Sequence, residues 1–179
     1  MSMQQQAQLI GVIGLAIIIA LLAFQRQIGK LRTAALLVTL GTVGLLEHPG
    51  FSIAYTLGAK SLPEARQLFL IPHAKIHFFM AAVYSLIALV LILFIAWEGL
   101  LRGRRTAWYA ILGVLIVGGG LELMAGRFIY QHGSPIYAPF GISIMGFGWE
   151  YLYLYLIAWT GALVVSFRPI FGKSNKEPA

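Results

Sequence analysis

The sequence contains no cysteine and no aspartate, and charged residues of any kind are scarce. Without cysteine the chain forms no disulfide and offers no thiolate, either as a nucleophile or as a metal ligand. Charged residues make up 11% of the 179 residues, whereas a soluble domain has about 25%. So few charged side chains cannot cover the water-facing surface of a domain this size. A soluble enzyme, a disordered tail and a nucleic-acid-binding domain are therefore excluded.

The chain has long apolar segments instead. Hydrophobic residues make up 59% of it, and its mean hydropathy is +0.83. A helix needs about 20 mainly apolar residues to cross the hydrocarbon core of a membrane. Five segments approach or exceed that length: 7–25, 33–48, 73–97, 106–125 and 141–167. We therefore predict an all-α fold: one integral membrane domain of five transmembrane helices over residues 1–171, followed by a flexible polar tail over 172–179.

Local signals refine these segments. No basic residue precedes the first one, which argues against a cleaved signal peptide. Pro49 ends or kinks the second segment. Ser61 and Glu64 form a capping-box pattern that predicts one short interfacial helix. Glycines in the fourth segment predict close approach of a neighbouring helix. These are Gly113, Gly118, Gly119 and Gly120. The loop over 127–140 is expected to be irregular, and Arg168-Pro169 is expected to close the fifth segment.

The basic residues predict an orientation in the membrane. With five spans, four Lys and Arg residues fall on the side that holds the N-terminus, and nine fall on the other side. Basic residues concentrate in the cytoplasmic loops of membrane proteins. The sequence therefore predicts an external N-terminus and a cytoplasmic C-terminus.

Ionisable residues inside or beside the spans converge on the non-cytoplasmic half. These are all four histidines and three of the six glutamates: Glu47, His48, His73, His77, Glu122, His132 and Glu150. An ionisable group within a span is costly, so it should face the bundle and have a partner. We predict one pocket near the non-cytoplasmic side whose catalytic residues are Glu47, His48, His77, Glu122 and Glu150. Trp149, Tyr151 and Tyr153 are predicted to contact a flat apolar substrate there.

Three classes of function fit such a pocket. The first and favoured one is acid–base catalysis on a membrane-dissolved lipid or isoprenoid, with no cofactor. The second is a metal or haem site, with His73, His77, Glu122 and Glu150 as ligands for zinc, iron or copper, or with two histidines axial to haem. The third is a non-catalytic subunit of a larger membrane complex, or a small carrier. Expected partners are membrane lipids, a lipid-like small molecule, and a second copy or larger complex; nucleic acid is not expected.

The layout resembles the emopamil-binding/EXPERA family over roughly residues 33–167. The shared features are five spans, a polar pair in the second span (Glu47-His48), a fourth span ending in Gly119-Gly120-Leu121-Glu122, and an aromatic fifth span with Trp149-Glu150-Tyr151. The resemblance implies a lipid pocket among the helices, and sterol-isomerase-like or lipid-binding activity by proton transfer without metal. In that family we expect a His and a Glu one turn apart in the second span, whereas in this chain Glu47 and His48 are adjacent. In the third span we expect a carboxylate, whereas this chain has His73 and His77.

Overall fold

The structure is a computed structural model, and it describes residues 3–46, 74–131 and 149–172. These residues are helical, with no strand among them, which confirms the all-α prediction for this part of the chain. In chain order the elements are α1 (Met3–Ala23), α2 (Gln25–Ile28), α3 (Lys30–Leu45), α5 (Ala74–Phe94), the π-helix η2 (Ile95–Leu100), α6 (Arg105–Gln131) and α7 (Trp149–Phe171).

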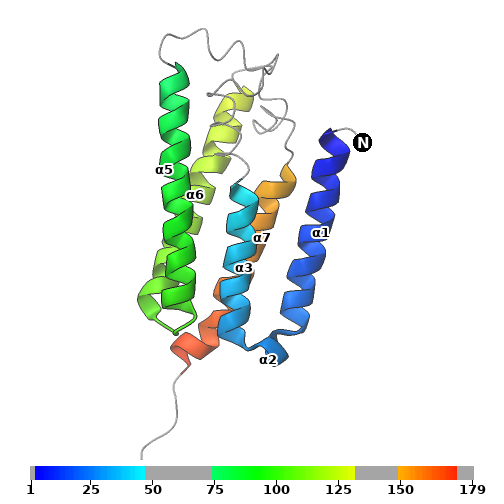
Figure 1. The fold of residues 1–179 in the computed structure, drawn as a ribbon, viewed down its shortest axis with the longest axis vertical. Helices are drawn as coiled ribbons and strands as arrows, with labels where there is room; N and C mark the ends of the chain where they lie inside the picture. Colours follow the sequence, from blue (N-terminus) through cyan, green and yellow to red (C-terminus); the bar gives the residue numbers. More distant parts are fainter. Residues whose placement is uncertain (1–2, 47–73, 132–148, 173–179) are drawn as a thin grey trace, which may run out of the picture.

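The five long helices alternate in direction (Figure 1). Two tight connections lie at the lower end in that view, and each uses a glycine with positive φ. Gly29, at φ 94°, follows α2 and precedes α3, and Gly103, at φ 69°, lies between η2 and α6. Side chains with a Cβ rarely adopt such angles. These two glycines therefore permit the sharp reversals that place α1 beside α3 and α5 beside the start of α6.

Two of the helical segments, Ala82–Leu100 and Leu154–Phe171, are long and apolar enough to cross a membrane. Gly11–Ala23 and Arg105–Gly118 are shorter apolar segments. The length and composition of the two longer segments are thus weak evidence for membrane association.

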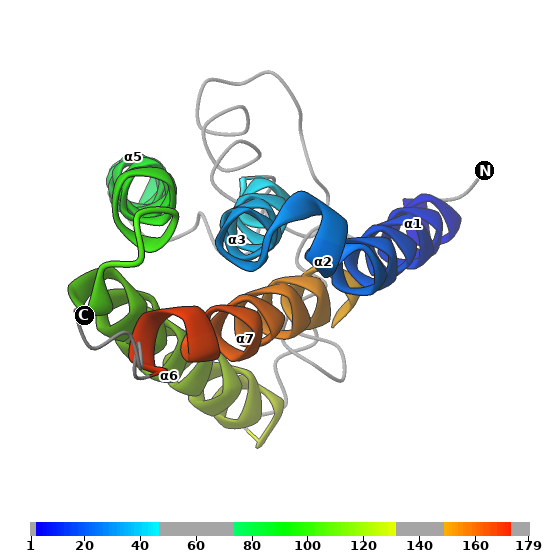
Figure 2. The same ribbon diagram turned by 90° about the horizontal axis from the view of Figure 1, so that it is seen from below.

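Helix α3 lies at the centre of the bundle. Seen along the bundle (Figure 2), it is flanked by α1, α5 and α7. Its residues from Thr33 to Leu45 include no charged side chain but have three threonines and two glycines. One face is fully buried, and its largest contact is with α7. Small and weakly polar residues let helices approach closely in a membrane bundle, where apolar bulk gives no advantage over lipid.

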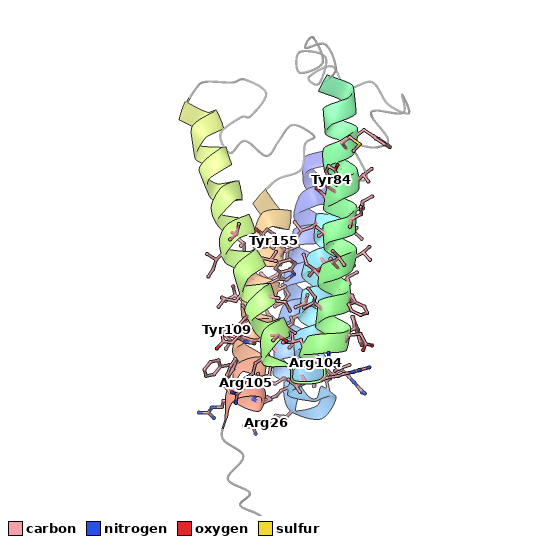
Figure 3. All side chains as sticks on the ribbon, turned by 90° about the vertical axis from the view of Figure 1, so that its left-hand side faces the viewer. Arg26, Tyr84, Arg104, Arg105, Tyr109 and Tyr155 are labelled. Carbon is pink, nitrogen blue, oxygen red and sulfur yellow. The ribbon has the colours of Figure 1, made fainter. Side chains whose placement is uncertain are left out.

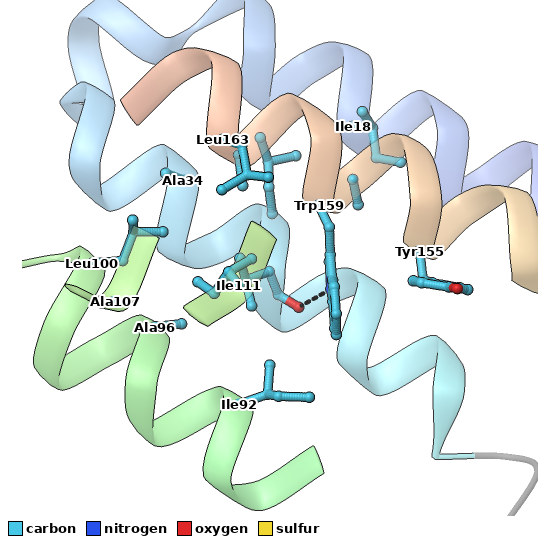
Figure 4. Close-up of a cluster of buried hydrophobic side chains, with 14 of the residues drawn as sticks. Ile18, Ala34, Ile92, Ala96, Leu100, Ala107, Ile111, Tyr155, Trp159 and Leu163 are labelled. Atoms are coloured by element: carbon cyan, nitrogen blue, oxygen red, sulfur yellow. Dashed lines mark hydrogen bonds between the residues drawn. The ribbon is translucent and has the colours of Figure 1, made fainter. Parts of the chain in front are cut away.

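Tryptophan indoles connect the helices by hydrogen bonds. Trp159 of α7, 1% exposed, donates from Nε1 to the Val38 carbonyl of α3 at 3.1 Å (Figure 4). Trp108 of α6 donates to the Leu163 carbonyl of α7 at 3.0 Å. Trp97 of η2 donates to Thr39 Oγ1 of α3 at 3.0 Å. Because lipid offers no acceptor, a buried indole N–H needs a partner within the bundle. These bonds therefore fix which faces of α3, α6 and α7 meet.

Glycine packing differs from the prediction. A Cβ added at Gly113 or Gly118 would meet nothing within 4 Å, so no helix among the described residues packs closely against either glycine. Close approach occurs instead at Gly41, where a Cβ would lie 2.7 Å from the Trp159 ring, and at Gly99, where it would collide with Ala107. At Gly113 and Gly118 the predicted close approach is therefore not found among the described residues, because glycine alone does not specify which face has a partner; the prediction at Gly119 and Gly120 is not tested.

Two helix ends also differ. Helix α6 continues to Gln131, so residues 127–131, which we expected to be irregular, are helical. Helix α7 continues through Pro169 to Phe171. A proline inside a helix removes one backbone bond, but the last turn is retained because Ile170 is buried and Phe171 packs on Trp108. Pro49 and the segment 61–64 lie outside the described residues.

Candidate functional site

One end of the bundle is rich in basic side chains. This basic end contains Arg26, Lys30, Arg32, Glu98, Arg102, Arg104, Arg105 and Arg168. Figure 3 shows Arg26, Arg104 and Arg105 together at the foot of the helices. Glu98 and Arg102, four residues apart, form a surface ion pair at this end. The four stretches 33–46, 79–97, 106–118 and 154–167 contain no charged residue.

Between its ends, the outside of the bundle is apolar. Large hydrophobic side chains are exposed on α1, α5, α6 and α7, among them Ile19, Leu91, Phe94, Ile116 and Val164. A soluble monomer rarely exposes a contiguous apolar surface beyond a few hundred Å². Such an exterior is what a helix bundle presents to lipid.

The backbone brings three predicted site residues to the end opposite the basic end. His77 lies in the first turn of α5, Glu150 in the first turn of α7, and Glu122 in the third-last turn of α6. At a rise of 1.5 Å per residue, about 35 Å of helix separates His77 from Leu100, and about 32 Å separates Glu150 from Phe171. About 26 Å separates Glu122 from Arg105. The backbone thus brings one histidine and two glutamates, from three different helices, to the same end of the bundle.

The structure describes the backbone, not the side chains, at His77, Glu122 and Glu150. The same holds for Trp149, Tyr151 and Tyr153, the predicted substrate contacts, which occupy the first turns of α7. Glu47, His48, His73 and His132 lie outside the described residues. Convergence of all these side chains on one pocket therefore stays a prediction.

Helices α5 and α6 diverge toward that opposite end. They come together near η2, which packs on α6, and then α5 packs on α3 while α6 packs on α7. Figure 3 shows the two helices separating with distance from the basic end, and Figure 2 agrees. The end that holds His77 and Glu122 is therefore the less tightly packed part of this helix pair.

For a metal centre, the described side chains contain no group of three His, Cys, Asp or Glu residues. The predicted ligands His73, His77, Glu122 and Glu150 are not among those side chains.

Sequence reasoning missed an aromatic cluster near the basic end. Trp108 and Tyr109 of α6 meet Phe167 and Phe171 of α7, with ring centroids 5.2–5.8 Å apart. The guanidinium carbon of Arg105 lies 5.4 Å from the centroid of the Phe171 ring. The i,i+4 spacing of Phe167 and Phe171 places both rings on one helix face, which was the available signal.

Comparisons with known proteins add no relative: no family model, curated protein or solved structure matches this chain. The resemblance to the emopamil-binding/EXPERA layout stays a prediction from the sequence.

Proposed function

We propose that the chain is an integral membrane protein of five spans, with its N-terminus outside and the basic end in the cytoplasm. Three observations support this proposal: the long helices alternate in direction, the exterior between the ends is apolar, and one end is rich in basic side chains. Seven of the eight charges at that end are basic, as expected for a cytoplasmic boundary.

The absence of cysteine makes the orientation easy to test, because any introduced thiol is the sole thiol. Gln27→Cys places one at the exposed basic end, and Ser134→Cys places one in the segment between α6 and α7. In intact cells, a membrane-impermeant maleimide should label Ser134→Cys and should label Gln27→Cys only after permeabilisation. The reverse pattern would contradict the orientation, and labelling of both in intact cells would contradict the spanning arrangement.

Within this bundle, the function supported best is an enzyme that moves protons on a lipid or isoprenoid substrate. The observation that carries this proposal is the backbone placement of His77, Glu122 and Glu150 at one end, on three different helices. Ionisable residues within spans are rare because a charge in hydrocarbon is expensive, and they commonly mark proton or substrate pathways.

The chemistry follows from the residue types. One carboxylic acid donates a proton to a carbon–carbon double bond, which leaves a carbocation, and a histidine or second carboxylate removes a proton from the neighbouring carbon. The double bond shifts, and no net oxidation occurs. Aromatic faces stabilise the cation, a role that we assign to Trp149, Tyr151 and Tyr153. Exposure of the α5 and α6 flanks to lipid would let an apolar substrate reach the site from within the membrane.

Solvent deuterium provides a test that does not require the substrate to be known. Membranes containing the protein are incubated in D₂O with total lipid extract, and lipids that gain deuterium are identified by mass spectrometry. Glu150→Gln should lower deuterium incorporation at least 100-fold, the usual contribution of general acid–base catalysis. Glu98→Gln, at the basic end, is the matched control and should retain the wild-type rate.

The same preparation separates the alternatives. If no lipid gains deuterium above membranes that lack the protein, the enzyme proposal is wrong, and a subunit or carrier replaces it. If the purified protein has stoichiometric metal or a Soret band, a metal or haem centre replaces the cofactor-free reaction.

A further inference from the structure

The basic end has an excess of positive charge that the described residues leave uncompensated. Glu98 is the one acidic side chain described there, and it is already paired with Arg102. Arg26, Lys30, Arg32, Arg104, Arg105 and Arg168 are all exposed. No described carboxylate is left for them. The described part of this surface therefore has a net positive charge, which suits an anionic partner.

Arg105 is held differently from its neighbour Arg102. Arg102 is neutralised by a carboxylate one helical turn away. Arg105 instead lies over the ring of Phe171, at 5.4 Å from its centroid. Stacking on an aromatic face orients a guanidinium while leaving its N–H groups available, and these groups match the oxygens of a phosphate. The guanidinium of Arg105 is thus held in one orientation, but no described carboxylate balances its charge.

Both aromatic and basic side chains belong to the surroundings of Arg105. Tyr109 and Phe167 are exposed by 58% and 51%, although both contact partly buried rings of the aromatic cluster. Arg168 follows Phe167 in the last turns of α7. Amphipathic aromatic residues favour the level of the lipid headgroups, and apolar side chains continue from there along α6 to Val117.

From this arrangement we infer that Arg105, with Arg168 and the aromatic cluster, binds the phosphate headgroup of an anionic phospholipid whose acyl chains lie along the α6–α7 flank. The inference rests on the membrane-spanning part of the proposed function and is independent of the reaction. It commits to a lipid rather than a free anion because the exposed rings and the apolar flank adjoin the charge.

Native mass spectrometry of the full-length protein in detergent tests the inference. Dioleoylphosphatidylglycerol and dioleoylphosphatidylcholine are titrated separately, because they differ in headgroup and net charge but have the same acyl chains. The anionic lipid should bind at least five-fold more tightly. Equal binding of the two lipids would overturn the inference, and so would displacement of the anionic lipid by equimolar inorganic phosphate, which would indicate a free-anion site.

Arg105→Gln and Arg102→Gln form a matched pair, because each lowers the net charge by one at the same end. Arg105→Gln should weaken phosphatidylglycerol binding about five-fold, equivalent to about 1 kcal/mol per basic residue at an anionic surface. Arg102→Gln should change it less than two-fold. Equal losses would mean that overall charge, not this site, attracts the lipid.

A second variant keeps the test valid if Arg105→Gln fails to fold. Phe171→Leu keeps the charge and the apolar volume but removes the ring beneath Arg105, so binding of the anionic lipid should fall about two-fold while phosphatidylcholine binding is unchanged. Wild-type affinity in Phe171→Leu would overturn the role of stacking. Flotation of the wild-type protein with phosphatidylcholine vesicles reports insertion separately: failure to float contradicts the membrane proposal, whereas flotation without lipid preference contradicts only this inference.

Discussion

The α3–α7 pair and the α5–η2–α6 hairpin use apolar residues in opposite ways. Helix α3 has threonines and glycines in its central turns and yet has a fully buried face. The segment Ala82–Leu100 is more apolar than Leu154–Phe171 of α7, but only 28% of it is buried against 44%. In water the more apolar helix would be the inner one. Here close packing and hydrogen bonds select the inner helices, and the bulky aliphatic residues remain outside, which is the arrangement that lipid favours.

The largest expected effect comes from a charge on the outer face of the hairpin. Leu91 is 55% exposed on α5. Leu91→Arg should raise the free energy of membrane insertion by about 3 kcal/mol, the cost of arginine near the centre of a span. The measurement is the fraction of protein that resists carbonate extraction from membranes. Gln27→Arg at the basic end should have no effect; an equally small effect of Leu91→Arg would mean that this face does not contact lipid.

A smaller but still large effect is expected within the α3–α7 pair. Gly41→Ala adds a Cβ that would lie 2.7 Å from the Trp159 ring and 3.1 Å from the Tyr155 backbone. Because the neighbours are a buried ring and a main chain, the free energy of unfolding should fall by about 2–3 kcal/mol. Gly44→Ala, one turn later with nothing within 4 Å, should gain up to about 1 kcal/mol from helix propensity. Unfolding by SDS in mixed micelles, monitored by circular dichroism, gives both changes in the free energy of unfolding. If both changes had the same sign, close packing at Gly41 would not distinguish the α3–α7 contact from an open helix face.

The tryptophan hydrogen bonds sharpen the contrast further. Trp159→Phe removes the bond to the Val38 carbonyl and leaves a small buried cavity, so unfolding should be easier by about 2 kcal/mol. Trp97→Phe removes the bond to Thr39 at a partly exposed position, where about 0.6 kcal/mol is typical. The same SDS titration ranks them. A larger loss for Trp97→Phe would place the critical contact in the hairpin rather than in the α3–α7 pair.

The smallest effect is expected at the ion pair of the hairpin. Glu98 and Arg102 are both well exposed, with 43% and 58% of their side chains accessible. Glu98→Gln should change the free energy of unfolding by no more than about 0.5 kcal/mol, as for other exposed pairs. A loss above 1 kcal/mol in the SDS titration would show that this pair fixes the turn between η2 and α6.

Much of the fold follows from the sequence because charge and apolar length mark where helices can lie. The predicted segments 7–25, 33–48, 73–97, 106–125 and 141–167 overlap α1, α3, α5 with η2, α6 and α7 in order. Helix partners are harder to predict. Gly41 and Gly113 look alike in sequence, and only the position of Trp159 makes the first a contact and leaves the second open. Pro169 was expected to end a helix that packing on α6 extends.

For the candidate site, the sequence predicts which residues share an end of the bundle but not which face each other. Alternation of the predicted spans is enough to bring His77, Glu122 and Glu150 to the same end of the bundle, and the described backbone agrees. Their rotation about each helix axis depends on side-chain packing that no pattern of polar residues fixes. The aromatic cluster shows the same limit, since the pairing of Trp108 with Phe171 depends on how α6 and α7 meet.

The junction of η2 with α6 has a mechanical consequence. Gly99 is pressed against Ala107 there, while His77 lies 22 residues further up the same arm, about 33 Å away at 1.5 Å per residue. The hairpin thus consists of two long helical arms that pack tightly against each other at one end. A tilt of about 5° at Gly99 moves the distant tip by about 3 Å, close to the width of a hydrocarbon chain. In the membrane arrangement proposed above, a change in packing at Gly99 is therefore expected to alter the separation of α5 and α6 at the level of His77 and Glu122.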